Sequence, residues 1–177
     1  IALTDIAGIS TSNTSRYISG PRIAAIKKSN LKNLFMKEII EVGDDPQDTT
    51  QYWDYVNMDN FDTKLWGLPM YIHMDLSESG DKTGIAGVIV KGKKPHQEGI
   101  PDSKELYYSL VFNVSVKAPK GHSISFEKKR QFIYWLKDQG FSIRGISTDT
   151  FLSFDTGQML KSKGFDYSSI SVDRVDS

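Results

Sequence analysis

The chain has 177 residues, 38% of them hydrophobic, and its 22 basic side chains balance 22 acidic ones. This length and composition fit one globular domain with a buried core. The zero net charge excludes the strongly basic balance of proteins that coat nucleic acid without regard to sequence. The lack of cysteine excludes disulfides, thiolate zinc sites and cysteine nucleophiles.

No stretch approaches the roughly 20 apolar residues of a membrane span, so we expect a soluble protein without a membrane partner. The chain opens at Ile1 without a methionine and stops at Ser177 within a polar run, which indicates a fragment of a larger polypeptide. Residues 8–20 are rich in serine and threonine and have glycine at each end, which is typical of a loop or an interdomain linker.

The next segment is predicted to be mostly irregular. Residues 34–42 alternate loosely and suit a short strand. Residues 43–63 hold six aspartates and no lysine or arginine, so this run would repel DNA. It is expected to be a solvated loop with a short helix around residues 52–56.

Three consecutive antiparallel strands are predicted to follow. Residues 70–75 form a strand that ends in Asp75, and residues 85–90 form its hairpin partner after a turn-rich segment. Residues 106–117 alternate between apolar and polar side chains, which is typical of a half-buried strand.

An amphipathic helix is predicted over residues 126–139, with Gly140 as its stop. A strand over residues 141–149 then ends in Asp149, and a short helix (about 154–163) precedes a last strand (165–172). The first helix is long enough to bring the 141–149 strand beside an earlier strand in parallel, and the 70–75 strand is the natural neighbour. The expected fold is α/β, a mixed five-stranded sheet with flanking helices.

This arrangement places Asp75 and Asp149 at the carboxyl ends of adjacent strands, where open α/β sheets bind ligands. Adjacent strands lie about 4.8 Å apart, so two carboxylates there can share a divalent cation that relieves their repulsion. Two magnesium or manganese ions at such a site can activate a water and stabilise the leaving oxygen in phosphodiester hydrolysis. A lone aspartate at a strand end is more often a turn or helix cap, but two at one sheet edge favour a nuclease.

Three runs carry a resemblance to a known family. They are Asp-Leu-Ser-Glu-Ser-Gly-Asp-Lys-Thr-Gly-Ile-Ala-Gly (75–87) after Ile-His-Met, Ser-Thr-Asp-Thr-Phe-Leu-Ser (147–153), and Ile-Ser-Val-Asp-Arg (170–174). From about residue 68 onward the chain resembles the nuclease domain of large terminase subunits from tailed phages, and residues 7–10 look like the connection from the ATPase half.

The resemblance implies a ribonuclease H-like domain over residues 34–177, truncated at its C-terminal end, after a linker (1–33) from an ATPase domain. It implies that Asp75 and Asp149 are catalytic metal ligands, that Asp81 binds or orients the second of two Mg²⁺ or Mn²⁺ ions, and that concatemeric double-stranded DNA is the substrate. The portal protein and the small terminase subunit are the implied partners. The implied location is the host cytoplasm at the prohead, outside the mature virion.

One departure concerns the third carboxylate, which in this family lies after the last strand seen here. Asp173 and Asp176 sit at a polar strand end rather than on a returning helix and are poor candidates. The fragment is therefore expected to bind metal weakly or not at all. No phosphate loop of the Gly-x-x-x-x-Gly-Lys-Ser/Thr type occurs in the sequence.

Basic residues and other polar motifs carry weaker signals. Lys91, Lys93 and Lys94 follow the second hairpin strand and are candidates for DNA phosphate contacts near the metal site, although a solvated hairpin tip explains them equally well. The cations at positions 128–130 are assigned to the solvent face of the predicted helix. His73 lies on the same face as Asp75, as a site neighbour or a packed histidine, and the three tryptophans are assigned to the core or to interfaces.

Three alternative functions stay open. A resolvase-type or transposase-type ribonuclease H-like nuclease would prefer branched DNA. An actin-like phosphate-binding fold would need a second glycine-rich phosphate loop, which the sequence lacks. A non-catalytic docking part of the packaging motor would show no activity even in the full-length protein.

Overall fold

The computed structural model describes residues 32–75, 82–93, 106–148 and 154–170. The chain divides into two compact units, Ile1–Lys32 and Asn33–Ser177. The fold described below belongs to the second unit, and nearly all of the expected linker lies outside the described residues.

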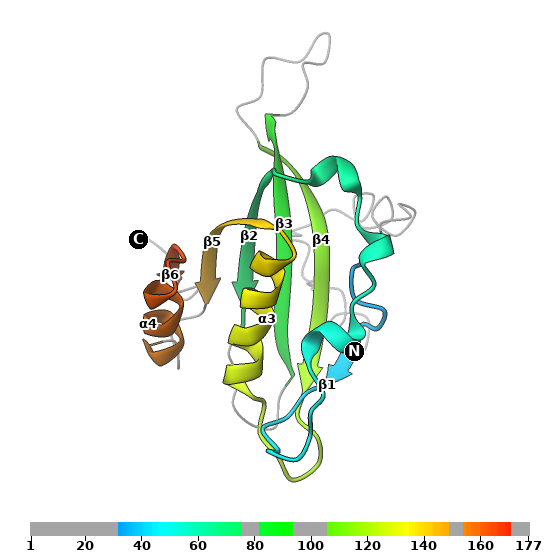
Figure 1. The fold of residues 1–177 in the computed structure, drawn as a ribbon, viewed down its shortest axis with the longest axis vertical. Helices are drawn as coiled ribbons and strands as arrows, with labels where there is room; N and C mark the ends of the chain where they lie inside the picture. Colours follow the sequence, from blue (N-terminus) through cyan, green and yellow to red (C-terminus); the bar gives the residue numbers. More distant parts are fainter. Residues whose placement is uncertain (1–31, 76–81, 94–105, 149–153, 171–177) are drawn as a thin grey trace, which may run out of the picture. The chain divides into compact units, whose positions relative to one another are not determined.

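A six-stranded mixed sheet forms the centre of this unit, in the order β1-β4-β3-β2-β5-β6 (Figure 1). The strands are β1 (Ile39–Glu41), β2 (Pro69–Met74), β3 (Thr83–Lys93), β4 (Leu106–Lys117), β5 (Ser142–Thr148) and β6 (Tyr167–Ser169). The predicted mixed sheet is confirmed, but the expected number of five strands is wrong. The additional strand is β1, which pairs in parallel with the end of β4 through Ile40 and Val116.

The pairing within the sheet follows the predicted order of strands. β2, β3 and β4 are consecutive antiparallel strands, while β5 runs parallel to β2 and β6 runs parallel to β5. The helix between β4 and β5 therefore acts as the predicted crossover, and β5 lies beside the first strand of the hairpin.

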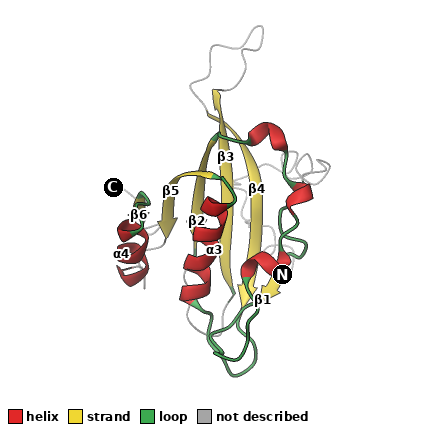
Figure 2. Ribbon diagram, viewed as in Figure 1, coloured by secondary structure: helices red, strands yellow, loops and turns green. Residues whose placement is uncertain are grey.

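Within the described ranges, the sheet is accompanied by the α-helices α3 (Phe126–Asp138) and α4 (Phe154–Ser162) (Figure 2). The Ser125 side chain caps α3 by accepting a hydrogen bond from the Lys128 amide at 3.2 Å. The predicted stop at Gly140 is confirmed, because its φ of 96° is a left-handed conformation that glycine adopts without steric cost.

The core lies between the sheet and α3. Met70, Ile72 and Met74 of β2 are buried, whereas the alternate Tyr71 and His73 are exposed, as the period of two requires. Phe112 of β4 meets Phe132 of α3 with a ring-centroid distance of 5.7 Å. This close packing depends on Gly87, because a Cβ atom there would lie 2.4 Å from the Phe112 ring.

The aspartate-rich segment before β2 is a chain of short 3-10 helices, η1 (Tyr52–Tyr55), η2 (Met58–Asn60) and η3 (Thr63–Leu65). Its aromatic residues anchor it to the core: Tyr52 stacks on Phe132 and Trp53 stacks on Trp135. The expected short helix near residues 52–56 is thus confirmed. Trp53 and Trp135 pack against each other as structural residues, whereas Trp66 is 40% exposed. None of the described helices is both long and apolar enough to cross a membrane.

Candidate active site at the β2–β5 edge

The carboxyl ends of β2 and β5 meet at one edge of the sheet. Met74, the last residue of β2, is the register partner of Thr148, the last residue of β5. Asp75 follows Met74 directly, is exposed, and donates its backbone amide to the Gly84 carbonyl at 2.9 Å. Asp149 follows Thr148 directly in the sequence, but it lies outside the described residues, as does Asp81.

His73 lies one register pair before this edge. Its partner across β2 and β5 is Ser147, and the His73 Nδ1 atom is 2.9 Å from the Ser147 hydroxyl oxygen. The histidine is exposed and lies on the face opposite the core. The structure thus places it near Asp75, hydrogen-bonded to the neighbouring strand.

A buried lysine behind Asp75 is the feature that sequence reasoning missed. Lys129 of α3 is 1% exposed, and its ammonium donates to the Thr83 hydroxyl at 3.0 Å and to the Asp75 carbonyl at 3.4 Å. The Thr83 hydroxyl itself donates to the same Asp75 carbonyl. These contacts join α3 to the end of β2 and the start of β3.

The surroundings of Lys129 are mostly apolar. Its ammonium lies 5.2 Å from the centre of the Phe126 ring, and none of the ion pairs within the described part of the chain includes it. Burial therefore lowers the pKa of Lys129 to about 8, while attraction to the nearby Asp75 carboxylate raises it in part. The assignment of Lys129 to the solvent face of the helix was wrong.

The end of β5 is held from the side of β6. The buried Thr148 hydroxyl lies 2.6 Å from the Tyr167 hydroxyl. The Tyr167 ring lies against Gly157 of α4, where a Cβ atom would be 2.4 Å from the ring. This packing positions the residue that directly precedes Asp149.

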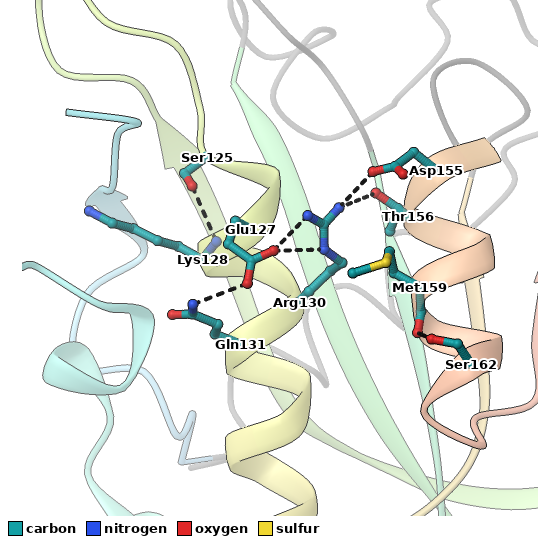
Figure 3. A network of polar contacts seen from close by, with 9 residues as sticks. All are labelled: Ser125, Glu127, Lys128, Arg130, Gln131, Asp155, Thr156, Met159 and Ser162. Carbon is teal, nitrogen blue, oxygen red and sulfur yellow. Dashed lines mark hydrogen bonds and ion pairs between the residues drawn. The ribbon is translucent and has the colours of Figure 1, made fainter. Parts of the chain in front are cut away.

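Arg130 is also buried, in contrast to its expected place on the solvent face (Figure 3). Its guanidinium donates to the Glu127 carboxylate, with the shortest contact at 2.6 Å, and to the Asp155 carboxylate at 3.3 Å. The Arg130 hydrogen bond keeps the pKa of Glu127 below its usual range. Because Asp155 and Thr156 belong to α4, this network ties α4 to α3 and is structural.

Lys91 and Lys93 lie at the opposite end of the hairpin from Asp75. β3 begins at Thr83 beside the end of β2 and runs away from that edge for its whole length. At about 3.4 Å per residue, the nine steps from Gly84 to Lys93 span roughly 30 Å. The expectation that these lysines lie near the metal site was wrong, their contact with DNA stays a prediction, and Lys94 lies outside the described residues.

The donor set for a divalent cation is only partly within the described residues, among which no group of three metal-ligating side chains gathers. Asp75 is the described carboxylate at the β2–β5 edge, and it is exposed to solvent. A site there would take its oxygen ligands from Asp75, Asp149 and Asp81, which suits Mg²⁺ or Mn²⁺.

Comparisons with known proteins add no relative: no protein family, no curated protein and no solved structure matches this chain.

Proposed function

We propose that this chain is a metal-dependent DNA endonuclease domain with a ribonuclease H-like fold, of the kind found in tailed-phage large terminase subunits. The observation that carries the proposal is the parallel pairing of β2 with β5, in which Met74 lies opposite Thr148. Asp75 and Asp149 each follow one of these paired residues, so chain connectivity brings both to the same sheet edge. We therefore infer that these two acidic residues, 74 positions apart in the sequence, can share a cation.

The fold class is proposed on the strand topology. Three antiparallel strands, a crossover helix and two further parallel strands support a ribonuclease H-like domain in which β1 is an added edge strand. The packaging role, and with it the portal protein, the small terminase subunit and double-stranded DNA as partners, is proposed on the sequence resemblance described above.

The residues of the chain have distinct parts in the proposed chemistry. Asp75 and Asp149 would hold one Mg²⁺ or Mn²⁺ ion, and Asp81 would help to hold a second. Bound ions of this type lower the pKa of water and neutralise charge on a phosphodiester, so the site needs no cysteine or serine nucleophile. The chain contributes rigid ligands, because β2 and β5 are interior strands of the sheet that pair in regular register from Tyr71 opposite Gly145 to Met74 opposite Thr148.

The proposal is tested first by metal binding. Titration calorimetry with Mn²⁺ is run on this chain and on a chain extended beyond Ser177. The extended wild type should bind Mn²⁺ more tightly than this chain, and its Asp75→Asn and Asp149→Asn variants should lose at least about tenfold in affinity. Asp138→Asn is the matched control, since it removes an exposed carboxylate at the end of α3. If neither this chain nor the extended chain binds Mn²⁺, or if Asp75→Asn binds as tightly as wild type, the proposed site is wrong.

Cleavage is the second test. Supercoiled plasmid is incubated with Mn²⁺, Mg²⁺ or EDTA, with this chain and with a chain extended beyond Ser177. We expect metal-dependent cleavage by the extended chain only, which would identify the absent third carboxylate as the defect of this chain. Asp75→Asn in the extended chain should abolish that cleavage while circular dichroism stays unchanged. Cleavage restricted to branched DNA would instead favour a resolvase, and no cleavage by either folded chain would favour a docking or phosphate-binding role.

A further inference from the structure

Three polar atoms form a hydrogen-bonded network where β2 ends and β3 begins. This end of the β2–β3 hairpin, formed by Asp75, Thr83 and Gly84, is called the hairpin base below. The Asp75 carbonyl accepts from both the Lys129 ammonium and the Thr83 hydroxyl, and the ammonium also donates to that hydroxyl. On the other side of the same residue, the Asp75 amide donates to the Gly84 carbonyl at 2.9 Å. Both backbone polar groups of Asp75 are therefore tied to neighbouring elements.

Simple packing does not account for a lysine at this position. A buried ammonium costs more free energy than an apolar side chain of similar length, unless it is paired with a carboxylate. Within the described ranges, the hydrogen-bond acceptors of Lys129 are neutral oxygens. Thr83 is likewise buried, with 1% of its surface exposed. The position of Lys129 and Thr83 is best explained by the Asp75 carbonyl to which both side chains donate.

We propose that Lys129 is a positioning residue of the β2–β5 site, which fixes the Asp75 backbone through its carbonyl and supplies a positive charge behind the acidic edge. The inference rests on the proposed nuclease function. Lys129 acts through Asp75 and not on the DNA, because its ammonium is enclosed by α3, β2 and β3. The Lys129 charge offsets the mutual repulsion of the carboxylates proposed for this edge. The hydrogen bonds hold the hairpin base, so that Asp75, as a proposed metal ligand, keeps its position at the end of β2.

The geometry is tested on the metal-free protein, without any reference to catalysis. Amide hydrogen exchange is measured by NMR in EDTA for the wild type, Lys129→Met and Lys128→Met. Lys128 is the matched control, because it is the preceding residue on α3 but donates to the Asp48 carbonyl instead. We expect Lys129→Met to speed exchange of the Asp75 amide by about tenfold or more, with the Ile72 amide unchanged, and Lys128→Met to leave both as in wild type.

The functional part is tested by Mn²⁺ affinity and by steady-state plasmid cleavage with the same variants, made in the chain extended beyond Ser177. Lys129→Met should lower Mn²⁺ affinity or kcat by about 10- to 100-fold, with KM for DNA within about threefold of wild type because the lysine does not contact DNA. Thr83→Val removes the hydroxyl but keeps the side-chain shape at position 83 and leaves the Lys129 charge in place. It should lower Mn²⁺ affinity or kcat by a smaller factor than Lys129→Met. Lys129→Gln keeps a donor without the charge and serves as the second substitution if Lys129→Met does not fold.

The outcomes separate the two ideas. If the wild type binds Mn²⁺ and cleaves, but folded Lys129→Met or Lys129→Gln does so equally well, the positioning role is wrong and the nuclease stands. If the extended wild type neither binds Mn²⁺ nor cleaves, the nuclease proposal is wrong, and the positioning role in that reaction falls with it. If exchange rises along all of β2 together with a loss of global stability, Lys129 is a packing residue and the inference is overturned.

Discussion

Replacing Lys129 with methionine should make the metal-free protein more stable near neutral pH. The lysine is 1% exposed, and burial lowers its pKa from the ordinary 10.5 to about 8. At about 1.4 kcal/mol per pH unit, this difference corresponds to a penalty of roughly 3 kcal/mol for keeping the protonated side chain in the folded state. Methionine is unbranched and apolar, so it can occupy the space without that cost.

The sign of the pH dependence follows from which state binds more protons. Between pH values of about 8 and 10.5 the unfolded chain holds the Lys129 proton and the folded chain does not, so wild-type stability rises with pH in this window. The penalty is fully present below about pH 8 and is lost above 10.5. Lys129→Met cannot show this dependence, and the difference between the two proteins should shrink as the pH rises.

Urea unfolding followed by circular dichroism, in EDTA, measures the difference directly. We expect Lys129→Met to be more stable than wild type by about 1 to 3 kcal/mol near pH 7, since the lost hydrogen bonds offset part of the gain. The difference should narrow by about 2 kcal/mol between about pH 8 and 9.5. A variant that is less stable than wild type throughout, or a difference that does not change with pH, would refute the reasoning.

Three further predictions concern the fold. Tyr52→Phe should leave stability unchanged or raise it by up to about 1 kcal/mol in thermal unfolding, because the Tyr52 hydroxyl is buried without a hydrogen-bond partner in the described structure; a clear loss would show that the hydroxyl is paired. Gly87→Ala should lower the free energy of unfolding by about 1 to 3 kcal/mol through its clash with Phe112. Gly84→Ala, with open space around it, should lower it much less. Equal losses of stability would contradict the packing argument. Arg130→Met should destabilise the protein by about 1 kcal/mol in urea unfolding. Asp155→Ala should destabilise it by less than about 0.5 kcal/mol, because the Asp155 side chain is 80% exposed. A larger loss of stability for Asp155→Ala than for Arg130→Met would show that this ion pair dominates the α3–α4 contact.

The elements with a clear local signal were predictable. β4 occupies the predicted residues, but its side chains alternate between buried and exposed only from Phe112 onward, and Leu106, Tyr108 and Leu110 are exposed. α3 ends where Gly140 permits a left-handed turn. The crossover rule was sufficient to place β5 beside β2. β1 was recognised as a short strand, but its place beside β4 depends on a parallel pairing between distant segments, which no local pattern encodes.

The errors concern long polar side chains. Lys129 and Arg130 were assigned to solvent because charged residues usually occupy the outer face of an amphipathic helix. Both side chains are buried because other elements pack against this turn of α3. Lys129 contacts the hairpin base, and Arg130 contacts α4. Lys91 and Lys93 were placed near the site because they follow the hairpin in the sequence, but the length of β3 carries them to its other end.

The sequence by itself determined the order of elements, the alternation that sorts each strand into a buried and an exposed face, and the acidic residue at the end of each strand that flanks the site. These are local properties, set by periods of two and 3.6 and by the conformational freedom of glycine. The tertiary structure alone decided that Met74 faces Thr148, that a sixth strand extends the sheet, and that Lys129 reaches the Asp75 carbonyl. Such contacts join segments that are tens of residues apart, and their existence depends on how the whole core packs.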